Sequence, residues 1–183
     1  PLSGKEKLIE RIFAATKKGS KVYWICPLIE ESENLDLNAV METYEDLSEY
    51  FGSSNVGCLH GKLSAKEKQN QIQAFKDSKT SILVSTTVVE VGVDIPDADI
   101  MVIENAERFG LAQLHQLRGR IGRGNKESFC ILMHKDKIQD ISMERLQALV
   151  DSQDGFKIAE KDLEIRGPGE IMGAQQTGIV PMK

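Results

Sequence analysis

The sequence has few aromatic residues, no long apolar run and no closely spaced cysteine pair. Aromatic residues make up only 5% of the 183 residues and apolar residues 40%, so aliphatic side chains must fill most of the core. No apolar run approaches the roughly 20 residues that a membrane-spanning helix needs. The N-terminus, PLSGKEKLIE, lacks a signal peptide's basic and apolar regions and an initiator methionine. These absences predict a cytoplasmic protein that does not enter the membrane, and the sequence reads as a piece of a longer chain.

The cysteines indicate neither disulfides nor a metal site. Cys26, Cys58 and Cys130 are odd in number, far apart and set in apolar stretches, and no CxxC pair is present. This pattern is typical of reduced cysteines in a core. Because the three histidines do not combine with them at metal-ligand spacings, no metal site is predicted.

Two glycine-containing stretches fall short of known nucleotide-binding motifs. A phosphate-binding loop reads G-x-x-x-x-G-K-[ST] after a strand, and residues 57–63, GCLHGKL, are one residue short of it. Leu63 also offers no hydroxyl to Mg²⁺. The stretch GPGEIMG, residues 167–173, is one residue too long for G-x-G-x-x-G and follows a predicted helix. The chain therefore lacks a Walker A motif, and a complete site for nucleotide hydrolysis is not expected.

Short apolar runs alternate with helical patterns through residue 136. The predicted strands are 21–26, 55–61, 81–85, 99–104 and 128–133; the predicted helices are 5–18, 37–51, one opening at a Ser64/Glu67 capping box, and 110–122, with an acidic loop over 28–36. This alternation predicts an α/β fold with a mainly parallel sheet covered on both faces. Ligands bind beyond the carboxyl ends of such strands, which directs attention to the loops starting at Pro27, His60, Thr86 and Asn105.

The pattern changes after residue 136. Residues 138–150 and 156–166 read as two helices joined at DSQDG, followed by a glycine–proline turn and a polar tail. We therefore predict a sheet domain over residues 1–136 and a helical hairpin with a tail over residues 137–183, outside the sheet.

A basic patch, QLRGRIGRG, stands out in a chain with a net charge of -5. On a helix, Arg120 and Arg123 would share a face, and the two glycines, Gly119 and Gly122, would allow a close approach by another backbone or a ligand. Guanidinium groups suit phosphate, and an arginine supplied across a cleft accelerates phosphoryl transfer on the order of 10³–10⁵-fold. The alternative is a solvated basic helix with two packing glycines.

The spacing Q-x-x-G-R-x-G-R resembles motif VI of the superfamily 2 helicases, and other stretches extend the resemblance. STTVVEVGVDIP (85–96) resembles motif V, which implies that Thr86 or Thr87 contacts DNA and that Gly92 and Asp94 lie near the nucleotide ribose. VYWICPLIEESE (22–33) and CLHGKLSAKEK (58–68) resemble the motif IV region, which implies that Gly61 and its neighbours meet phosphate.

Each of these residues also has a structural interpretation. Asp94 could cap a turn before Pro96, and Thr86 or Thr87 could cap a helix after a strand. His60 could be a satisfied histidine at a strand end. The occurrence of four motifs in the right order favours the functional interpretation.

The C-terminal region resembles the translocation motif of the RecG and Mfd families, and the wording RGPGE and QLHQLRGRIGRG is more similar to RecG. The motif's three side chains correspond to Arg145, Arg166 and Gln176.

The resemblance implies the second RecA-like motor domain of a helicase with P-loop-NTPase-type topology, followed by a translocation hairpin. ATP and Mg²⁺ would be held mainly by an N-terminal RecA-like domain of the same polypeptide, and Arg120 and Arg123, helped by Gln116, would reach its γ-phosphate. A wedge domain would also lie upstream, and the substrates would be stalled forks and branched DNA junctions. The isolated chain is not expected to hydrolyse ATP.

Three alternatives remain open at this point. The chain could come from an Mfd-type transcription-repair translocase, or it could be a non-catalytic module that binds nucleic acid or phosphate. It could also be a regulatory domain whose arginine patch contacts an acidic protein.

Overall fold

The computed structural model describes residues 4–27, 33–86, 98–122 and 127–166. In chain order these residues form α1 (Lys5–Lys17), β1 (Val22–Cys26), α2 (Glu33–Phe51), η2 (Ser53–Asn55), β2 (Val56–Leu59), α3 (Ala65–Lys76), β3 (Ile82–Thr86), β4 (Ile100–Ile103), η4 (Ala106–Arg108), α4 (Leu111–Arg118), β5 (Phe129–Leu132), α5 (Asp140–Asp151) and α6 (Gly155–Arg166). Among these helices, none has both the length and the apolar character required to cross a membrane.

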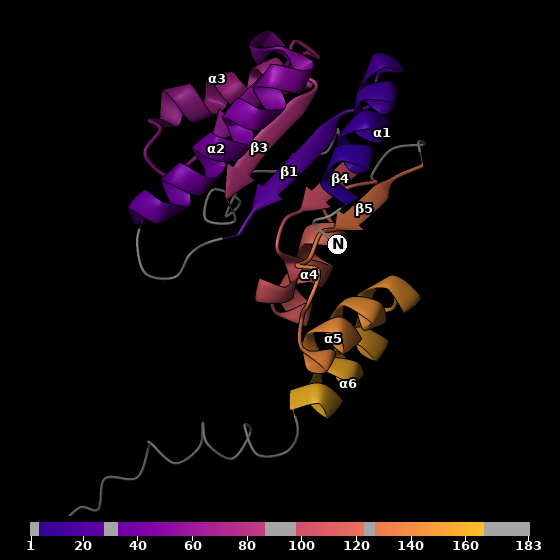
Figure 1. Ribbon diagram of the computed structural model, residues 1–183. Helices are drawn as coiled ribbons and strands as arrows, with labels where there is room; N and C mark the ends of the chain where they lie inside the picture. Colours follow the sequence, from indigo (N-terminus) through magenta and orange to yellow (C-terminus); the bar gives the residue numbers. More distant parts are fainter. Residues whose placement is uncertain (1–3, 28–32, 87–97, 123–126, 167–183) are drawn as a thin grey trace, which may run out of the picture.

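The strands form one parallel sheet in the order β2-β3-β1-β4-β5 (Figure 1). β1 is the central strand, where Trp24 pairs with Val84 on one side and with Val102 on the other. Every residue of β1, β3 and β4 is buried. The predicted α/β fold is therefore confirmed, because short continuous apolar runs are typical of strands covered on both faces.

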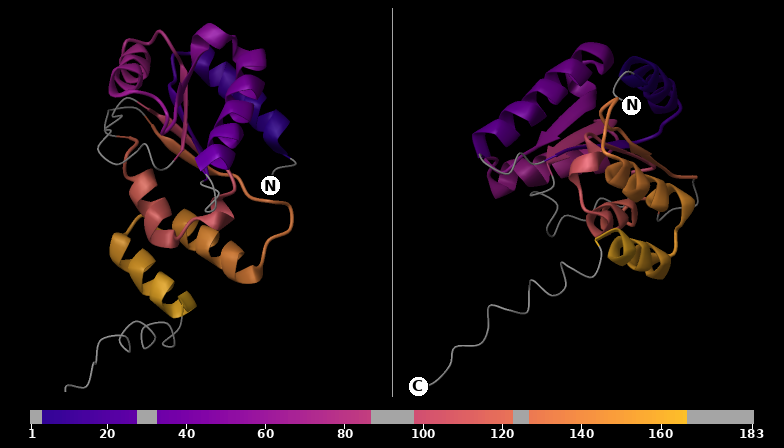
Figure 2. Two further views of the ribbon diagram at one scale, coloured as in Figure 1. Left: turned by 90° about the vertical axis from the view of Figure 1, so that its left-hand side faces the viewer. Right: turned by 60° about the horizontal axis from the view of Figure 1, so that its bottom comes forward.

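The two faces of the sheet carry separate hydrophobic clusters. Val22, Trp24 and Cys26 pack with the apolar sides of α1 and α2. Tyr23 and Ile25, which alternate with them, point to the opposite face and pack with α3 and α4. Figure 2 shows α1 and α2 on one side of the sheet and α4 to α6 on the other.

Local signals in the sequence place two helix ends correctly. The Ser64 hydroxyl accepts from the Glu67 backbone N–H at 3.2 Å, and the Glu67 carboxylate accepts from the Ser64 N–H at 2.7 Å, so the predicted capping box opens α3. α1 ends just before Gly19, which has a φ of +92° that glycine adopts readily.

Two predicted boundaries were wrong. α2 begins at Glu33, within the stretch predicted as an acidic loop. α4 ends at Arg118, four residues before the predicted end. The reason lies in the glycines that follow, because Gly119 is the C-cap and Gly122 has a φ of +77°, which does not continue a helix.

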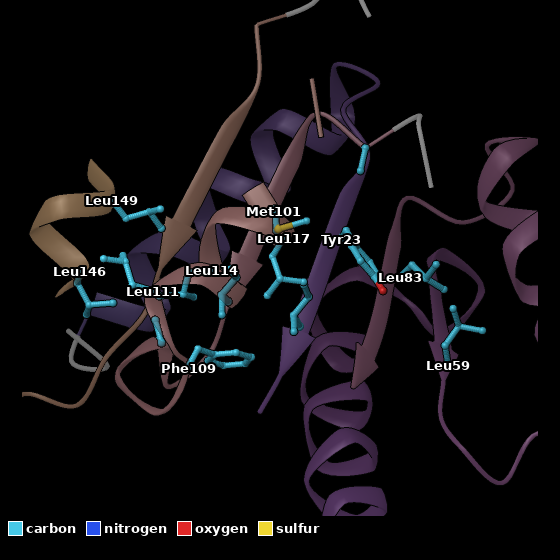
Figure 3. Close-up of a cluster of buried hydrophobic side chains, with 14 of the residues drawn as sticks. Tyr23, Leu59, Leu83, Met101, Phe109, Leu111, Leu114, Leu117, Leu146 and Leu149 are labelled. Carbon is cyan, nitrogen blue, oxygen red and sulfur yellow. The ribbon is translucent and has the colours of Figure 1, made fainter. Parts of the chain in front are cut away.

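The predicted helical hairpin is present as α5 and α6, and it packs on α4. Leu146 and Leu149 of α5 and Ile158 of α6 are buried in the same cluster as the leucines of α4, as Figure 3 shows for the α5 side chains. The hairpin therefore shares its core with one face of the sheet. The domain boundary after residue 136 stays a prediction.

Candidate functional site

The carboxyl ends of the parallel strands lie at one edge of the sheet, where the sequence directs the search for a site. The residues that follow β1 and β3, for which loops were predicted, are 28–32 and 87–97 and lie outside the described residues. Thr87, Gly92 and Asp94 belong to the second of these loops, so their predicted roles stay predictions.

The loop after β2 is described and exposes Gly61. A Cβ on Gly61 would meet nothing within 4 Å, so the backbone there is open to an incoming group. Lys62 beside it donates to the Asn34 side chain at 2.6 Å, which ties this loop to the start of α2. An exposed glycine next to a lysine at the N-terminal side of α3 is suited to a phosphate. The predicted phosphate contact of Gly61 is consistent with this placement and remains a prediction.

His60 lies between β2 and Gly61, and its ring is partly covered. Its Nδ1 atom is buried and has no hydrogen-bond partner. Burial, and then the positive charge of Lys68, lower the pKa of His60 below its ordinary value of 6.5. The lowered pKa favours the neutral ring, and the unpaired Nδ1 differs from the satisfied strand-end histidine of the structural interpretation.

Thr86 is the last residue of β3 and is only 3% exposed. The neighbouring Ser85 is also buried, and its hydroxyl donates to the Thr86 carbonyl at 2.8 Å. Burial weighs against Thr86 as the residue that contacts DNA directly, and leaves Thr87 as the other member of the predicted pair.

Glu104 follows β4 and was not singled out in the sequence. Its carboxylate, with a side chain 12% exposed, accepts from Trp24 Nε1 at 3.0 Å and lies 3.2 Å from Lys5 Nζ. The contact joins the central strand and α1 at the carboxyl edge. Only the position of an acidic residue directly after a predicted strand could have suggested it.

The three cysteine thiols are free, and burial disfavours their thiolate forms. Burial, and then the charge of Glu104, raise the pKa of Cys26 to about 12. Burial also raises the pKa of Cys58 and of Cys130 to about 11. Within the described ranges, no group of three or more His, Cys, Asp or Glu residues is placed to hold a metal ion.

α4 presents its leucines inward and Gln116 outward. Leu111, Leu114 and Leu117 are buried, whereas Gln116 is exposed on the other side of the helix. Gln116 is therefore accessible, as its predicted role requires.

Arg120 lies beyond the end of α4, which ends at Arg118. The expectation that one helix places Arg120 and Arg123 on a shared face was therefore wrong. Arg120 is half-buried, and its backbone N–H donates to the Leu117 carbonyl at 3.0 Å. Arg123 lies outside the described residues. Arg120 therefore belongs to a turn after α4, in which Gly122 has a positive φ.

The glycines of this segment differ in what they require. A Cβ on Gly122 would collide with the Ser128 hydroxyl, and its φ of +77° already disfavours other residues. A Cβ on Gly119 would make ordinary contacts of 3.5 Å and 3.6 Å with backbone oxygens. The group that lies close to Gly122 is the Ser128 side chain, and the predicted approach of another backbone or a ligand to the two glycines stays a prediction.

Arg118 points to the hairpin. Its Nη1 donates to the carbonyls of Leu149 and of Ser152, the latter at 2.8 Å. Nothing in the sequence indicates this role for Arg118, because its partners are 31 and 34 residues away and no local pattern marks them.

The predicted translocation residues Arg145 and Arg166 lie on α5 and α6. Arg145 is half-buried, and its Nε has no hydrogen-bond partner. Arg166 is exposed, lies 3.1 Å from the Asp162 carboxylate, and comes within 3.9 Å of the point where a Cβ on Gly110 would stand. The structure thus brings Arg166 to the start of α4. Gln176 lies outside the described residues.

The chain matches two helicase families in sequence. Residues 4–125 match the helicase conserved C-terminal domain, and residues 152–181 match the C-terminal part of domain 3 of ATP-dependent DNA helicase RecG.

Curated relatives match the chain along nearly all of its length. It is 52% identical over 170 residues to the ATP-dependent DNA helicase RecG of Haemophilus influenzae, covering 93% of the chain and 24% of that protein. It is 50% identical over 184 residues to RecG of Escherichia coli K12, covering 100% of the chain and 27% of that protein. The chain thus spans about a quarter of the length of these relatives.

Solved structures give the same picture. The structure of RecG bound to a three-way DNA junction matches with a TM-score of 0.75 and 43% identity, over 100% of the chain and 23% of that protein. The C-terminal domain of the DEAD-box protein Dbp5 matches with a TM-score of 0.55 and 19% identity, over 85% of the chain and 90% of that domain, a likeness of fold alone.

Proposed function

Because the chain belongs to the helicase conserved C-terminal domain family, we propose that it is the second motor domain and translocation hairpin of a RecG-type ATP-dependent DNA helicase. The observation that carries this proposal is the match to RecG proteins, which extends over the whole chain at half-identical sequence. The order of the two family matches supports it, since the motor part precedes the RecG-specific part.

The proposed catalytic site is divided between two domains of one polypeptide. The N-terminal RecA-like domain would hold ATP and Mg²⁺, and hydrolysis of the nucleotide supplies the free energy for movement. From this chain, Arg120 and Arg123 reach the γ-phosphate, helped by Gln116, while Gly92 and Asp94 lie near the ribose. Guanidinium groups fit this role because they are always charged and match phosphate geometry.

A catalytic site shared by two domains explains how ATP hydrolysis could move the domains relative to each other. Arg120 and Arg123 attract the γ-phosphate while it is attached, which favours the closed arrangement of the two motor domains. Hydrolysis removes that difference in contact between the closed and open arrangements, so the cleft opens. The charge that the arginines neutralise is also largest in the transition state, so the same residues accelerate the reaction.

The DNA contacts proposed for this chain are to the phosphate backbone. Gly61 is exposed next to Lys62, and of the predicted pair Thr86 and Thr87 we propose Thr87 as the contact, because Thr86 is buried. Contacts of this kind position a nucleic acid without reading its bases. They suit a motor that acts on forked or branched DNA of any sequence.

The hairpin is proposed to convert the opening and closing of the cleft into movement along duplex DNA, through Arg145, Arg166 and Gln176. The packing of α5 and α6 on α4 supports this, because α4 leads into residues 119–123, which we call the arginine segment. With a wedge domain upstream to separate the strands, the whole protein would remodel stalled replication forks and recombination junctions during DNA repair in the cytoplasm.

The test is a comparison of the full-length protein with this chain alone. With Mg²⁺, ATP and a forked DNA, the full-length protein is expected to hydrolyse ATP and unwind the fork, whereas the 183-residue chain hydrolyses none. Turnover by the chain that disappears in an Arg123→Ala variant would contradict the divided site. Fork-stimulated turnover by the full-length protein without unwinding would instead favour an Mfd-type translocase.

A further inference from the structure

Arg118 joins the end of α4 to the end of α5. Its Nη1 donates to the Leu149 and Ser152 carbonyls, which lie in the last turn of α5 and at its C-cap. The last carbonyls of a helix lack intrahelical partners and carry partial negative charge, so a guanidinium both satisfies and neutralises them. The planar fork of arginine can bond two carbonyls at once, which a lysine ammonium does with less fixed direction.

The same end of α4 also contacts the start of α6. Arg118 Nη2 lies 3.2 Å from Nδ1 of His115. On the other side of the ring, a Cβ placed on Gly155 would come 3.0 Å from His115 Nε2. One turn of α4 therefore contacts both helices of the hairpin at the point where they are joined.

That turn is also hydrogen-bonded to the segment that carries Arg120. The Gly119 N–H donates to the His115 carbonyl at 3.1 Å, and the Arg120 N–H donates to the Leu117 carbonyl at 3.0 Å. The Ile121 N–H donates to the carbonyl of Arg118 itself at 3.4 Å. Arg120 and Arg118 are thus joined through the hydrogen-bonded backbone of one turn.

The packing beside this contact is open. A cavity of about 500 Å³ is lined by Gly119 and Gly122 of the arginine segment, by Leu132 of β5 and by Val150 of α5. Packing contacts between the arginine segment and α5 are therefore incomplete, with Ile121 packing against the cluster that contains Leu149. Arg118 borders the cavity, and its hydrogen bonds join the end of α4 to the end of α5.

We infer that Arg118 is a positioning residue that couples the arginine segment to the hairpin during the ATP cycle. It touches neither nucleotide nor DNA in this role. Its guanidinium holds the α5–α6 junction against the turn of α4 from which the arginine segment starts. The inference rests on the proposed function, and it adds a residue for which the translocation motif of Arg145, Arg166 and Gln176 does not account.

The experiment uses the full-length protein with Arg118→Met and Arg118→Lys variants, and with Arg11→Met as a matched control on the exposed face of α1. We expect Arg118→Met to keep ATP turnover within about twofold and to lose roughly fivefold or more in base pairs unwound per ATP. Arg118→Lys should fall between it and the unaltered protein. Arg11→Met should change neither quantity.

Amide hydrogen exchange gives a readout that a purely structural role would not move. In the unaltered protein, AMP-PNP with Mg²⁺ should change the protection of residues 140–155. In Arg118→Met the same nucleotide should still change protection in residues 119–127 and should leave residues 140–155 as they were.

Three results would overturn the inference. The first is an unchanged number of base pairs per ATP in Arg118→Met. The second is a parallel fall of turnover and unwinding with a lower Tm, which indicates a structural role. The third applies if Arg118→Met fails to fold. In that case Arg118→Lys is measured instead, and an unchanged number of base pairs unwound per ATP in Arg118→Lys would overturn the inference. The proposed function fails by a different result, the absence of fork-stimulated turnover in the unaltered protein.

Discussion

The indole N–H of Trp24 donates to the carboxylate of Glu104 at 3.0 Å, across 80 residues of sequence. Trp24 is fully buried on the central strand, and Glu104 begins the loop after β4. The Lys5 ammonium lies 3.2 Å from the same carboxylate, so one acidic side chain unites β1, β4 and α1 at the edge where the candidate site lies.

Glu104→Ala should therefore destabilise the fold. The change leaves the buried indole N–H without an acceptor, which costs about 1–3 kcal/mol in the free energy of unfolding. Denaturant unfolding of the 183-residue chain, followed by the fluorescence of its single tryptophan, measures the loss. Glu42→Ala, an exposed glutamate on α2, is the control and should change the free energy little. An equal effect of the two substitutions would contradict the contact.

Gly122 and Gly119 offer a matched pair of substitutions in the arginine segment. Gly122→Ala should cost about 1–3 kcal/mol in the free energy of unfolding, because a φ of +77° strains alanine. Gly119→Ala should be neutral or stabilising by up to about 1 kcal/mol, since its φ of −67° suits alanine. Thermal unfolding of both variants side by side tests the difference, and a reversed order would show that the segment has another conformation.

Arg123→Ala in the full-length protein should abolish ATP turnover while largely sparing DNA binding. An arginine supplied across a cleft contributes on the order of 10³-fold or more to phosphoryl transfer, whereas the DNA contacts come from other loops. Turnover with saturating forked DNA and a binding titration with the same fork measure the two properties. Near-normal turnover would remove Arg123 from the site, and Arg11→Ala provides the control for loss of an arginine.

Arg166→Ala should uncouple hydrolysis from unwinding. The Arg166 side chain is exposed, but Asp162 is only 16% exposed and loses its partner, so the fold should lose about 1–3 kcal/mol. Turnover and unwinding of a fork are measured together, with Lys157→Ala on the same helix as the control. A parallel loss of both activities would indicate misfolding or weakened DNA binding instead.

The strands could be predicted from the sequence because their information is local. VYWIC is apolar at every position, which is typical of a strand covered on both faces. Ser64 and Glu67, three residues apart, indicate the start of α3. The end of α4 was missed because the spacing of the arginine motif was assumed to be helical, although two glycines interrupt it. The start of α2 was missed because acidic residues at a helix N-terminus resemble those of a loop.

The contacts around the candidate site could not be predicted, because their partners are distant in sequence. Glu104 and Trp24 are brought together by the strand order, which places β4 beside β1. Arg118 binds backbone carbonyls, and any residue type can supply these, so no sequence pattern marks its partners. The resemblance to a family identified the motif residues but not the contacts of Glu104 and Arg118.

The direction of α6 along α4 determines where a chimaera between two such proteins can be joined. The first residue of α6, Gly155, lies against His115 near the end of α4, and its last, Arg166, lies beside Gly110 at the start. A hairpin transplanted from another protein would therefore have to match the whole length of α4 as well as its own partner helix. The natural cut for a chimaera falls at Gly110, ahead of α4, so the arginine segment and the hairpin should be inherited as one unit.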